Sequence, residues 1–124
     1  MKASITNYRQ APRKVRLVAT LVKGKTVGDA LATLTHLPKR AALPMKKLIE
    51  SAIKNAENQG KKKENLFISD FRVDKGMVFK RFMPRARGRA ALIRRESSHV
   101  ILALTEGVPP KKGRNAKKPV VANA

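Results

Sequence analysis

The segment KGMVFKRFMPRARGRAALIRR, residues 75–95, decides how the chain is built. It carries eight positive charges and no negative one, and Pro84 and Gly88 interrupt its middle. Strand-like runs flank it on both sides, so we expect a β-hairpin whose tip lies near Gly88. From Val78 to Gly88 one arm of this hairpin would span about 33 Å at roughly 3.3 Å per residue, which carries it well past the core.

The runs on either side of this segment have the alternation of strands. Residues 66–68 and 71–73 read as strand, but the alternation slips near Asp70, which predicts a bulge. On the returning side, residues 99–104 alternate with one face more apolar than the other. Residues 2–9 alternate more weakly and predict a further strand.

Two acids lie close together on the strand that leads into the hairpin. Asp70 and Asp74 are the only neighbouring pair among eight scattered Asp and Glu residues. On a bulged strand with basic neighbours, we expect them to form ion pairs with Arg72 or Lys75 rather than a catalytic pair.

Apolar residues at helical spacing predict three helices in the first half of the chain. The first covers about residues 13–23, with Pro12 tolerated where the helix begins. The second follows Thr26, whose hydroxyl oxygen can accept a first-turn N–H, and ends before Pro38. The third covers residues 41–58.

The length of 124 residues suits one domain, which we place at residues 1–106. Four Phe and one Tyr are the only aromatic residues, so the core must rest on Val, Leu, Ile and Ala. Residues 107–124 hold three prolines, five basic residues and no acid, and we expect this tail to be disordered. There is no cysteine, no apolar leader and no run of about 18 apolar residues, which favours a soluble protein of the cell interior.

Charge is the dominant signal of the composition. Twenty-nine Lys and Arg against eight Asp and Glu give a formal net charge of +21, which disfavours a compact state unless a polyanion neutralises it. Nucleic acid is the obvious polyanion, because neutralised phosphates release their condensed counterions. An anionic membrane surface is the rival, but it would require a basic helix with a large apolar face, and no such helix with bulky aromatic residues is present in the sequence.

The hairpin's charge run could be an ordinary solvated loop, but three features favour RNA contact. Six of its eight cations are Arg, whose planar fork matches phosphates and stacks on bases. Apolar residues, two Phe and two Met among them, are interleaved with the charges. An isolated two-stranded ribbon is marginal in water, so we expect this one to take a fixed shape only when RNA surrounds it.

The predicted RNA-binding residues fall into two clusters. Those of the hairpin are Lys80, Arg81, Arg85, Arg87, Arg89, Arg94 and Arg95. A second cluster, for which ordinary surface charge is an equal alternative, begins the first helix and consists of Arg9, Arg13, Lys14 and Arg16. Cations at a helix N-terminus oppose the helix dipole, a small cost that a nearby phosphate would offset.

A search for catalytic and metal-binding patterns finds almost nothing. We expect His36 at a helix end and His99 beside the sheet, with neither in a metal site. No glycine-rich phosphate loop, zinc-ligand spacing or nucleophile–base pair is readable. We therefore predict that the chain is not an enzyme and uses no cofactor, metal or small-molecule substrate.

Five stretches match the pattern of one known family, and they are APRKVRLV (11–18), GK (24–25), SAIKNAEN (51–58), KRFMPRARGRA (80–90) and SSHV (97–100). They resemble the family of the bacterial-type large-subunit ribosomal protein number twenty-two. The resemblance covers residues 1 to about 106 in order, and the segment PRARGR is highly specific. One departure is Ala91-Leu92, where relatives often have Asp-Arg, so the returning arm is more apolar here.

The resemblance implies an α+β fold, in which three helices pack on a small three-stranded antiparallel sheet with a long hairpin extension at about 78–97. It implies a structural constituent of the large subunit that binds its ribosomal RNA during early assembly, beside neighbouring ribosomal proteins. The body would lie near the exit of the nascent-peptide tunnel. The hairpin would line the tunnel wall next to the nascent peptide, with Arg87, Gly88 and Arg89 nearest the tip. The location would be the ribosome of the cytoplasm or of an organelle of bacterial descent, without membrane contact.

Two rival functions remain open from the residues alone. An architectural DNA-binding protein could insert a basic ribbon into the minor groove, although that class would usually dimerise through an apolar seam. An RNA-modifying enzyme would need an acid–base or cofactor site that the sequence does not contain.

Overall fold

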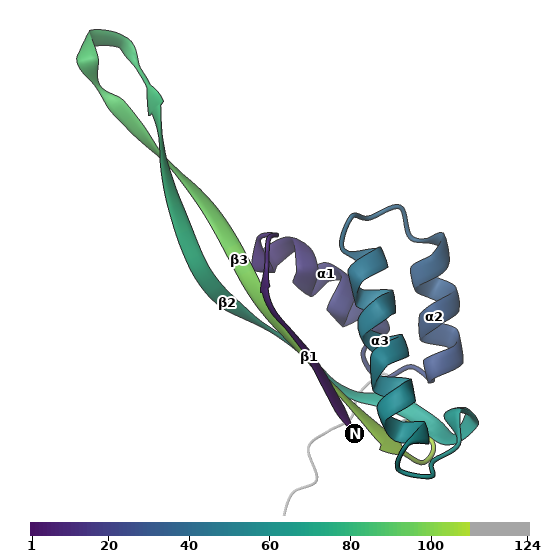
Figure 1. Cartoon of the computed structure of the whole chain (residues 1–124). Coiled ribbons are helices and arrows are strands. Elements are labelled where there is room, and N and C mark those ends of the chain that lie inside the picture. The colour runs from purple at the N-terminus through teal and green to yellow at the C-terminus, as the bar shows by residue number, and fades with distance from the viewer. Residues whose placement is uncertain (110–124) are drawn as a thin grey trace, which may run out of the picture.

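The computed structural model describes residues 1–109, in which three helices cover one face of a three-stranded antiparallel sheet (Figure 1). The strands are β1 (Lys2–Tyr8), β2 (Leu66–Pro84) and β3 (Ala90–Glu106), in the order β1-β3-β2. Strands β2 and β3 continue far beyond the helices as a two-stranded extension (Figure 1). The predicted α+β fold with a long hairpin is confirmed.

The helices begin and end within about one residue of their predicted bounds. They are α1 (Pro12–Val22), α2 (Val27–His36) and α3 (Ala42–Glu57). At the start of α2 the predicted cap is present, because the Thr26 hydroxyl accepts a hydrogen bond of 3.2 Å from the backbone N–H of Asp29. Short 3-10 turns lie before β2 and at the hairpin tip.

The core lies between the helices and one face of the sheet. Leu102 on the central strand pairs with Phe71 on one side and with Ala3 on the other, and all three face the helices. As the composition predicted, the core is aliphatic, with Phe71 as its only buried aromatic residue. Fully buried side chains of the core include Val15, Val22, Val27, Met45, Ile49, Ile68, Val100 and Leu102.

Two irregularities interrupt the pairing of β2 with β3. The first lies between Ile68 and Asp70, which confirms the predicted bulge. The second, between Lys75 and Val78, was not predicted. We call residues 78–96 the arm. The elbow consists of Gly76, Met77 and residues 97–99, and the remaining described residues form the body.

The elbow is closely packed on the β2 side. A Cβ atom added to Gly76 would lie 2.6 Å from the Ser97 hydroxyl oxygen, so only glycine fits here without displacing a neighbour. The hydroxyl of Ser97 is buried and donates a hydrogen bond of 2.7 Å to the carbonyl of Met77. The second bulge is therefore fixed by a contact across the two strands.

On the β1 side the elbow is held by two further hydrogen bonds. The buried Ser98 hydroxyl donates to the carbonyl of Gln10. The Nδ1 atom of His99 accepts a bond of 3.1 Å from the backbone N–H of Asn7, which has a left-handed φ of 53°. His99 thus lies within β3 and supports the end of β1, and His36 is the final residue of α2, the helix end predicted for it.

The ion pairs of β2 agree with the prediction for one acid and not for the other. Asp74 pairs with Arg72 at 3.1 Å. Asp70 instead pairs with Lys23 at 2.6 Å, so its predicted pairing with Arg72 or Lys75 is wrong. Helix α1 packs across β2, and its C-terminal neighbour Lys23 reaches the bulge, a contact that spacing along one strand does not reveal.

Candidate nucleic-acid interface

The tip of the arm is a tight turn that presents three guanidinium groups. The last strand pair is Pro84 with Ala90, and the backbone N–H of Arg85 donates a hydrogen bond of 2.8 Å to the carbonyl of Arg89. Arg87 and Gly88 both adopt left-handed conformations, with φ of 59° and 70°. The predicted tip is confirmed, and all residues of the turn are exposed.

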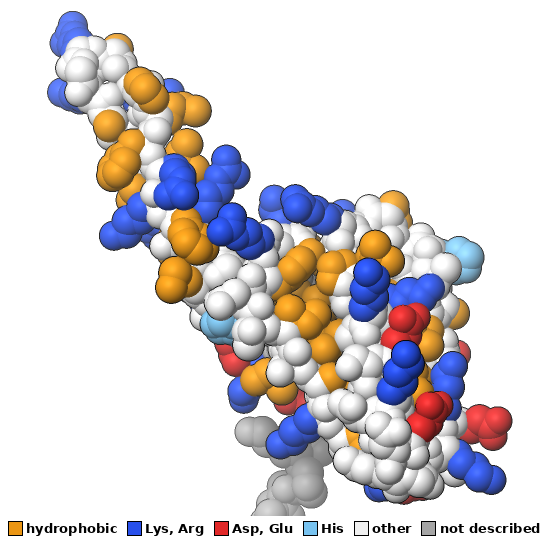
Figure 2. Space-filling view, in the orientation of Figure 1, with side chains coloured by type: hydrophobic (Ala, Val, Ile, Leu, Met, Phe, Trp, Pro, Cys, Tyr) orange, Lys and Arg blue, Asp and Glu red, His pale blue; other side chains and the backbone are white. Residues whose placement is uncertain are grey.

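Cations and apolar side chains are interspersed along the arm (Figure 2). Directly opposed residues of an antiparallel ribbon share a face, so Phe82 lies beside Leu92, and Arg81 lies beside Ile93 on the other face. Phe82 is 70% exposed and Leu92 is 45% exposed. The arm therefore offers apolar surface and positive charge together on both of its faces.

The cations of the arm have no acid to neutralise them within residues 1–109. The arm's only carboxylate, that of Glu96 at its base, lies 3.4 Å from the ammonium of Lys75. The described part of the chain holds three other ion pairs, and all of them join residues of the body. Positive charge is thus densest on the arm, where seven Lys and Arg and one acid fall within 19 residues.

A groove of about 820 Å³ lies where the arm leaves the body. Its walls come from the β1–α1 junction, from the α2–α3 loop and from both strands of the arm. We call it the basic groove, because its lining includes six cationic side chains, which are Arg9, Lys14, Arg40, Arg81, Arg94 and Arg95.

An aromatic ring supports one of these cations. The guanidinium carbon of Arg9 lies over the ring of Phe79, 4.9 Å from its centroid. Phe79 is half-buried and is the only aromatic residue that lines the basic groove. The contact joins the β1–α1 junction to the arm, and it orients a planar cation that borders the groove.

The two predicted clusters are joined only in part. Arg9 and Lys14 lie with the arm's cations in the basic groove, whereas Arg13 and Arg16 do not line it. The Nε atom of Arg16 donates a hydrogen bond of 3.1 Å to the carbonyl of Val73, which ties α1 to β2. Arg16 therefore contributes to the packing of α1 on β2, in addition to any contact that it makes with RNA.

Sequence reasoning missed two residues of the groove. Arg40 follows the end of α2, and no pattern in the sequence marks it, because only the packing of α2 on α3 brings it near the arm. Phe79 is one of the two Phe interleaved with the charges of the hairpin, but the sequence does not indicate which cation it contacts. An Arg seventy positions away in the sequence cannot be matched to one particular Phe by spacing alone.

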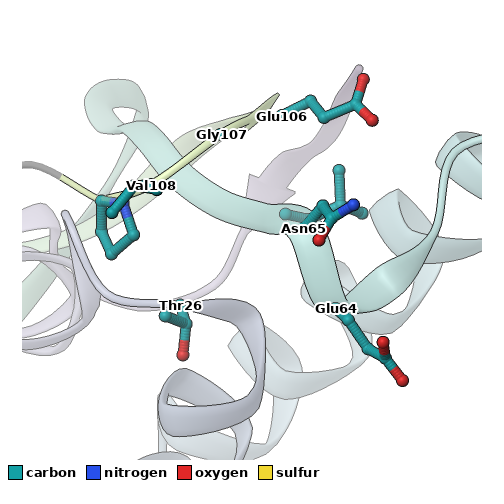
Figure 3. Close-up of a pocket in the computed structure, with 8 residues that line it drawn as sticks. Thr26, Glu64, Asn65, Glu106, Gly107 and Val108 are labelled. Atoms are coloured by element: carbon teal, nitrogen blue, oxygen red, sulfur yellow. The ribbon is translucent and has the colours of Figure 1, made fainter.

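A second cleft, of about 340 Å³, lies at the end of the sheet opposite the arm. Thr26, Asn65 and Val108 line it, together with two acids, Glu64 and Glu106. Figure 3 shows both carboxylates pointing outward, away from Thr26 and Val108. The two acids do not converge on one point, so this cleft has no acid–base arrangement.

Residues 1–109 hold no group of three or more His, Cys, Asp or Glu placed to hold a metal ion. None of the helices described there is long and apolar enough to cross a membrane. The predicted tail lies outside the described residues from position 110 onward.

Comparison with known proteins gives a consistent result over the body and the arm together. A family model described as ribosomal protein L22p/L17e matches residues 3–105. The large ribosomal subunit protein uL22 of Pelobacter propionicus is 45% identical over 105 residues, which cover 84% of this chain and 95% of that protein. The protein of the same name from Herpetosiphon aurantiacus is 46% identical over 107 residues, which cover 86% and 95%.

Proposed function

The chain belongs to the ribosomal protein L22p/L17e family, and on that premise we propose that its arm and its basic groove bind large-subunit ribosomal RNA. Members of this family are structural constituents of the large ribosomal subunit and are not enzymes, which confirms the resemblance found in the sequence. Residues 1–106 would act as one RNA-binding domain. Its other partners would be neighbouring ribosomal proteins and the nascent peptide.

The observation that carries this proposal is the set of arm cations without acidic partners in the described residues. The arm bears seven Lys and Arg among 19 residues, and its one acid already contacts Lys75, so its positive charge requires an external anion to neutralise it. Each phosphate that such an arm neutralises releases condensed counterions, and that release favours binding. The interleaved apolar side chains can contact unstacked bases and sugars between the phosphates.

The shape of the arm supports a finer proposal about its place in the subunit. The arm is only two strands wide and exposes both faces, so it can pass between RNA segments that a globular domain would displace (Figure 1). We propose that it runs inward and lines the wall of the nascent-peptide tunnel, with Arg87, Gly88 and Arg89 nearest the peptide. The body would lie near the tunnel exit and assist early assembly, in a cytoplasmic ribosome or in one of an organelle of bacterial descent.

The test compares two triple substitutions in the full chain. Replacing Arg85, Arg87 and Arg89 with Glu should leave the helical body folded by circular dichroism and weaken binding to ribosomal RNA. The magnitude of the slope of log affinity against log salt should fall by about two to three, because roughly 0.7–0.9 of a counterion is released per contact. The matched control makes the same change of net charge at the exposed body residues Lys47, Lys54 and Lys63.

The control triple should reduce the affinity and the salt slope less than the tip triple does. Equal effects of the two triples would mean that net charge alone matters and that the arm is not the contact surface. The RNA-modifying alternative predicts turnover of an RNA substrate by the purified chain, and the present proposal predicts none.

A further inference from the structure

The basic groove differs from the arm's tip in the number of segments that form it. Its six cations come from the β1–α1 junction, from α1, from the α2–α3 loop and from both strands of the arm. The only acid in its lining is Glu96, whose carboxylate already contacts Lys75. Since like charges repel, an arrangement that places so many together is stabilised by an anion in the groove.

The groove is also rich in hydrogen-bond donors and poor in free acceptors. The side-chain oxygen of Gln10 accepts a bond of 2.8 Å from the Tyr8 hydroxyl, which leaves the amide NH₂ of Gln10 as a donor. The backbone carbonyl of Gln10 is occupied by the Ser98 hydroxyl. A ligand for this groove must therefore supply acceptors, as phosphate oxygens and base edges do.

A flat platform distinguishes this groove from a simple phosphate site. Arg9 is exposed, its guanidinium carbon lies over the Phe79 ring at 4.9 Å from the centroid, and both residues line the groove. A guanidinium plane supported by an aromatic ring is a stacking surface for a nucleobase. A phosphate alone would make no use of the ring.

We propose that the basic groove binds a single-stranded, non-helical segment of RNA, with an unstacked base on the Arg9–Phe79 platform. Backbone phosphates of the same segment lie against Arg40 on one wall and Arg81 and Arg95 on the other. The space of about 820 Å³ has room for a nucleotide as well as a phosphate. This inference rests on the proposed function and adds to it a preference for single-stranded over double-stranded RNA. Paired bases inside an A-form helix offer no exposed face that could stack on the platform.

The test uses the full chain and two probes, an oligouridylate of about 12 nucleotides and an RNA duplex of about the same length. Arg9→Lys keeps the charge and removes the planar guanidinium. We expect it to weaken binding of the oligouridylate about tenfold, to leave duplex binding within about twofold, and to leave the salt slope of both unchanged.

Matched variants separate stacking from charge and from folding. Arg72→Lys makes the same chemical change at an exposed body residue outside the groove and should leave both affinities as they are. Phe79→Leu should repeat the effect of Arg9→Lys, and Phe79→Tyr, which keeps the ring, should restore single-strand binding. Equal loss on both probes, or no loss on either, would overturn the inference.

Crosslinking by ultraviolet light locates the base independently of affinity. Trypsin releases Phe79 in the peptide of residues 76–80 and the exposed Phe82 in the peptide of residues 82–85. We expect a uridine adduct on the first peptide in the wild type and its loss in Arg9→Lys. Adducts found only on the second peptide would overturn the platform while leaving RNA binding by the arm intact. A wild-type chain that binds neither probe nor ribosomal RNA would instead contradict the proposed function.

Discussion

Strands β2 and β3 run through both the body and the arm, and the two regions differ in what covers the strands. Val100 and Leu102 on β3 are fully buried beneath the helices, whereas Leu92, earlier on the same strand, is 45% exposed. The backbone pairing continues through both regions. A continuous pair of strands is therefore stabilised by a hydrophobic core at one end, while its other end has no core at all.

The two regions also differ in how their charges are paired. Within the described residues, the body pairs Lys23 with Asp70 and Arg72 with Asp74, whereas residues 78–95 of the arm contain no acid. A two-stranded ribbon is marginal in water without a surface to pack on. The body should therefore be stable as a free protein, and the arm should become ordered when RNA supplies both the anions and the surface.

The largest difference between the two regions is expected in the free energy of unfolding when one apolar side chain is truncated in each. Ile49→Ala removes fully buried atoms from the core and should lower the free energy of unfolding by about 2–5 kcal/mol. Phe82→Ala removes a larger side chain that is 70% exposed and should change it by less than about 0.5 kcal/mol. Urea unfolding followed by circular dichroism measures both. Similar losses would mean that the arm packs on the body in solution.

The next largest effect is expected at the elbow. Gly76→Ala would place a methyl group 2.6 Å from the Ser97 hydroxyl oxygen and break the hydrogen bond from Ser97 to Met77. Overpacking of this kind costs about 1–3 kcal/mol. The same unfolding measurement checks it, with Gly28→Ala, where an added Cβ meets nothing within 4 Å, as the control for a glycine with open space around it. An unchanged free energy of unfolding for Gly76→Ala would show that the elbow is loose.

A smaller and local effect is expected at the tip. Gly88 has a φ of 70°, and an alanine there would be strained by about 1 kcal/mol although nothing lies within 4 Å of its Cβ. Since the tip is remote from the core, Gly88→Ala should disturb the turn's nuclear magnetic resonance signals and leave the unfolding of the body unchanged. A matching loss in body stability would contradict the separation of the two regions.

The smallest effect concerns pH. The hydrogen bond from Lys23 holds the pKa of Asp70 below its ordinary value of 3.8. A lowered pKa means that this pair contributes its stabilisation above about pH 4 and loses it as pH falls through the lower, folded-state pKa. Because the pair is half-exposed, the contribution is small. Acid unfolding curves of the wild type and of Asp70→Asn check it, and the variant should lose part of the slope below pH 4.

Much of the fold follows from local patterns, which is why it could be predicted. Helical spacing set the bounds of α1 and α3 to within one residue, the cap at Thr26 set the start of α2, and the turn chemistry around Gly88 set the hairpin tip. The second bulge could not be predicted in this way. It depends on the close approach of Gly76 to Ser97 on the opposite strand, and no pattern within β2 contains that information.

The candidate site likewise has a part that local sequence predicts and a part that only tertiary packing brings together. The arm's cations stand out by their density in the sequence, and residues such as Arg85 and Arg89 needed no tertiary information. The basic groove did, because it brings Arg9 and Arg40 to the arm from separate elements. The partner of Asp70 was predicted wrongly for the same reason, since Lys23 reaches it from another element.

Amide hydrogen exchange of the full chain, free and bound to large-subunit ribosomal RNA, tests the contrast between body and arm most directly. In the free chain, α3 should be strongly protected, while the backbone amides of residues 78–96 exchange fast. On binding RNA, the arm's amides should become protected and those of α3 should change little. An arm already as protected as α3 without RNA, or one still unprotected with RNA bound, would contradict the claim that RNA orders the arm.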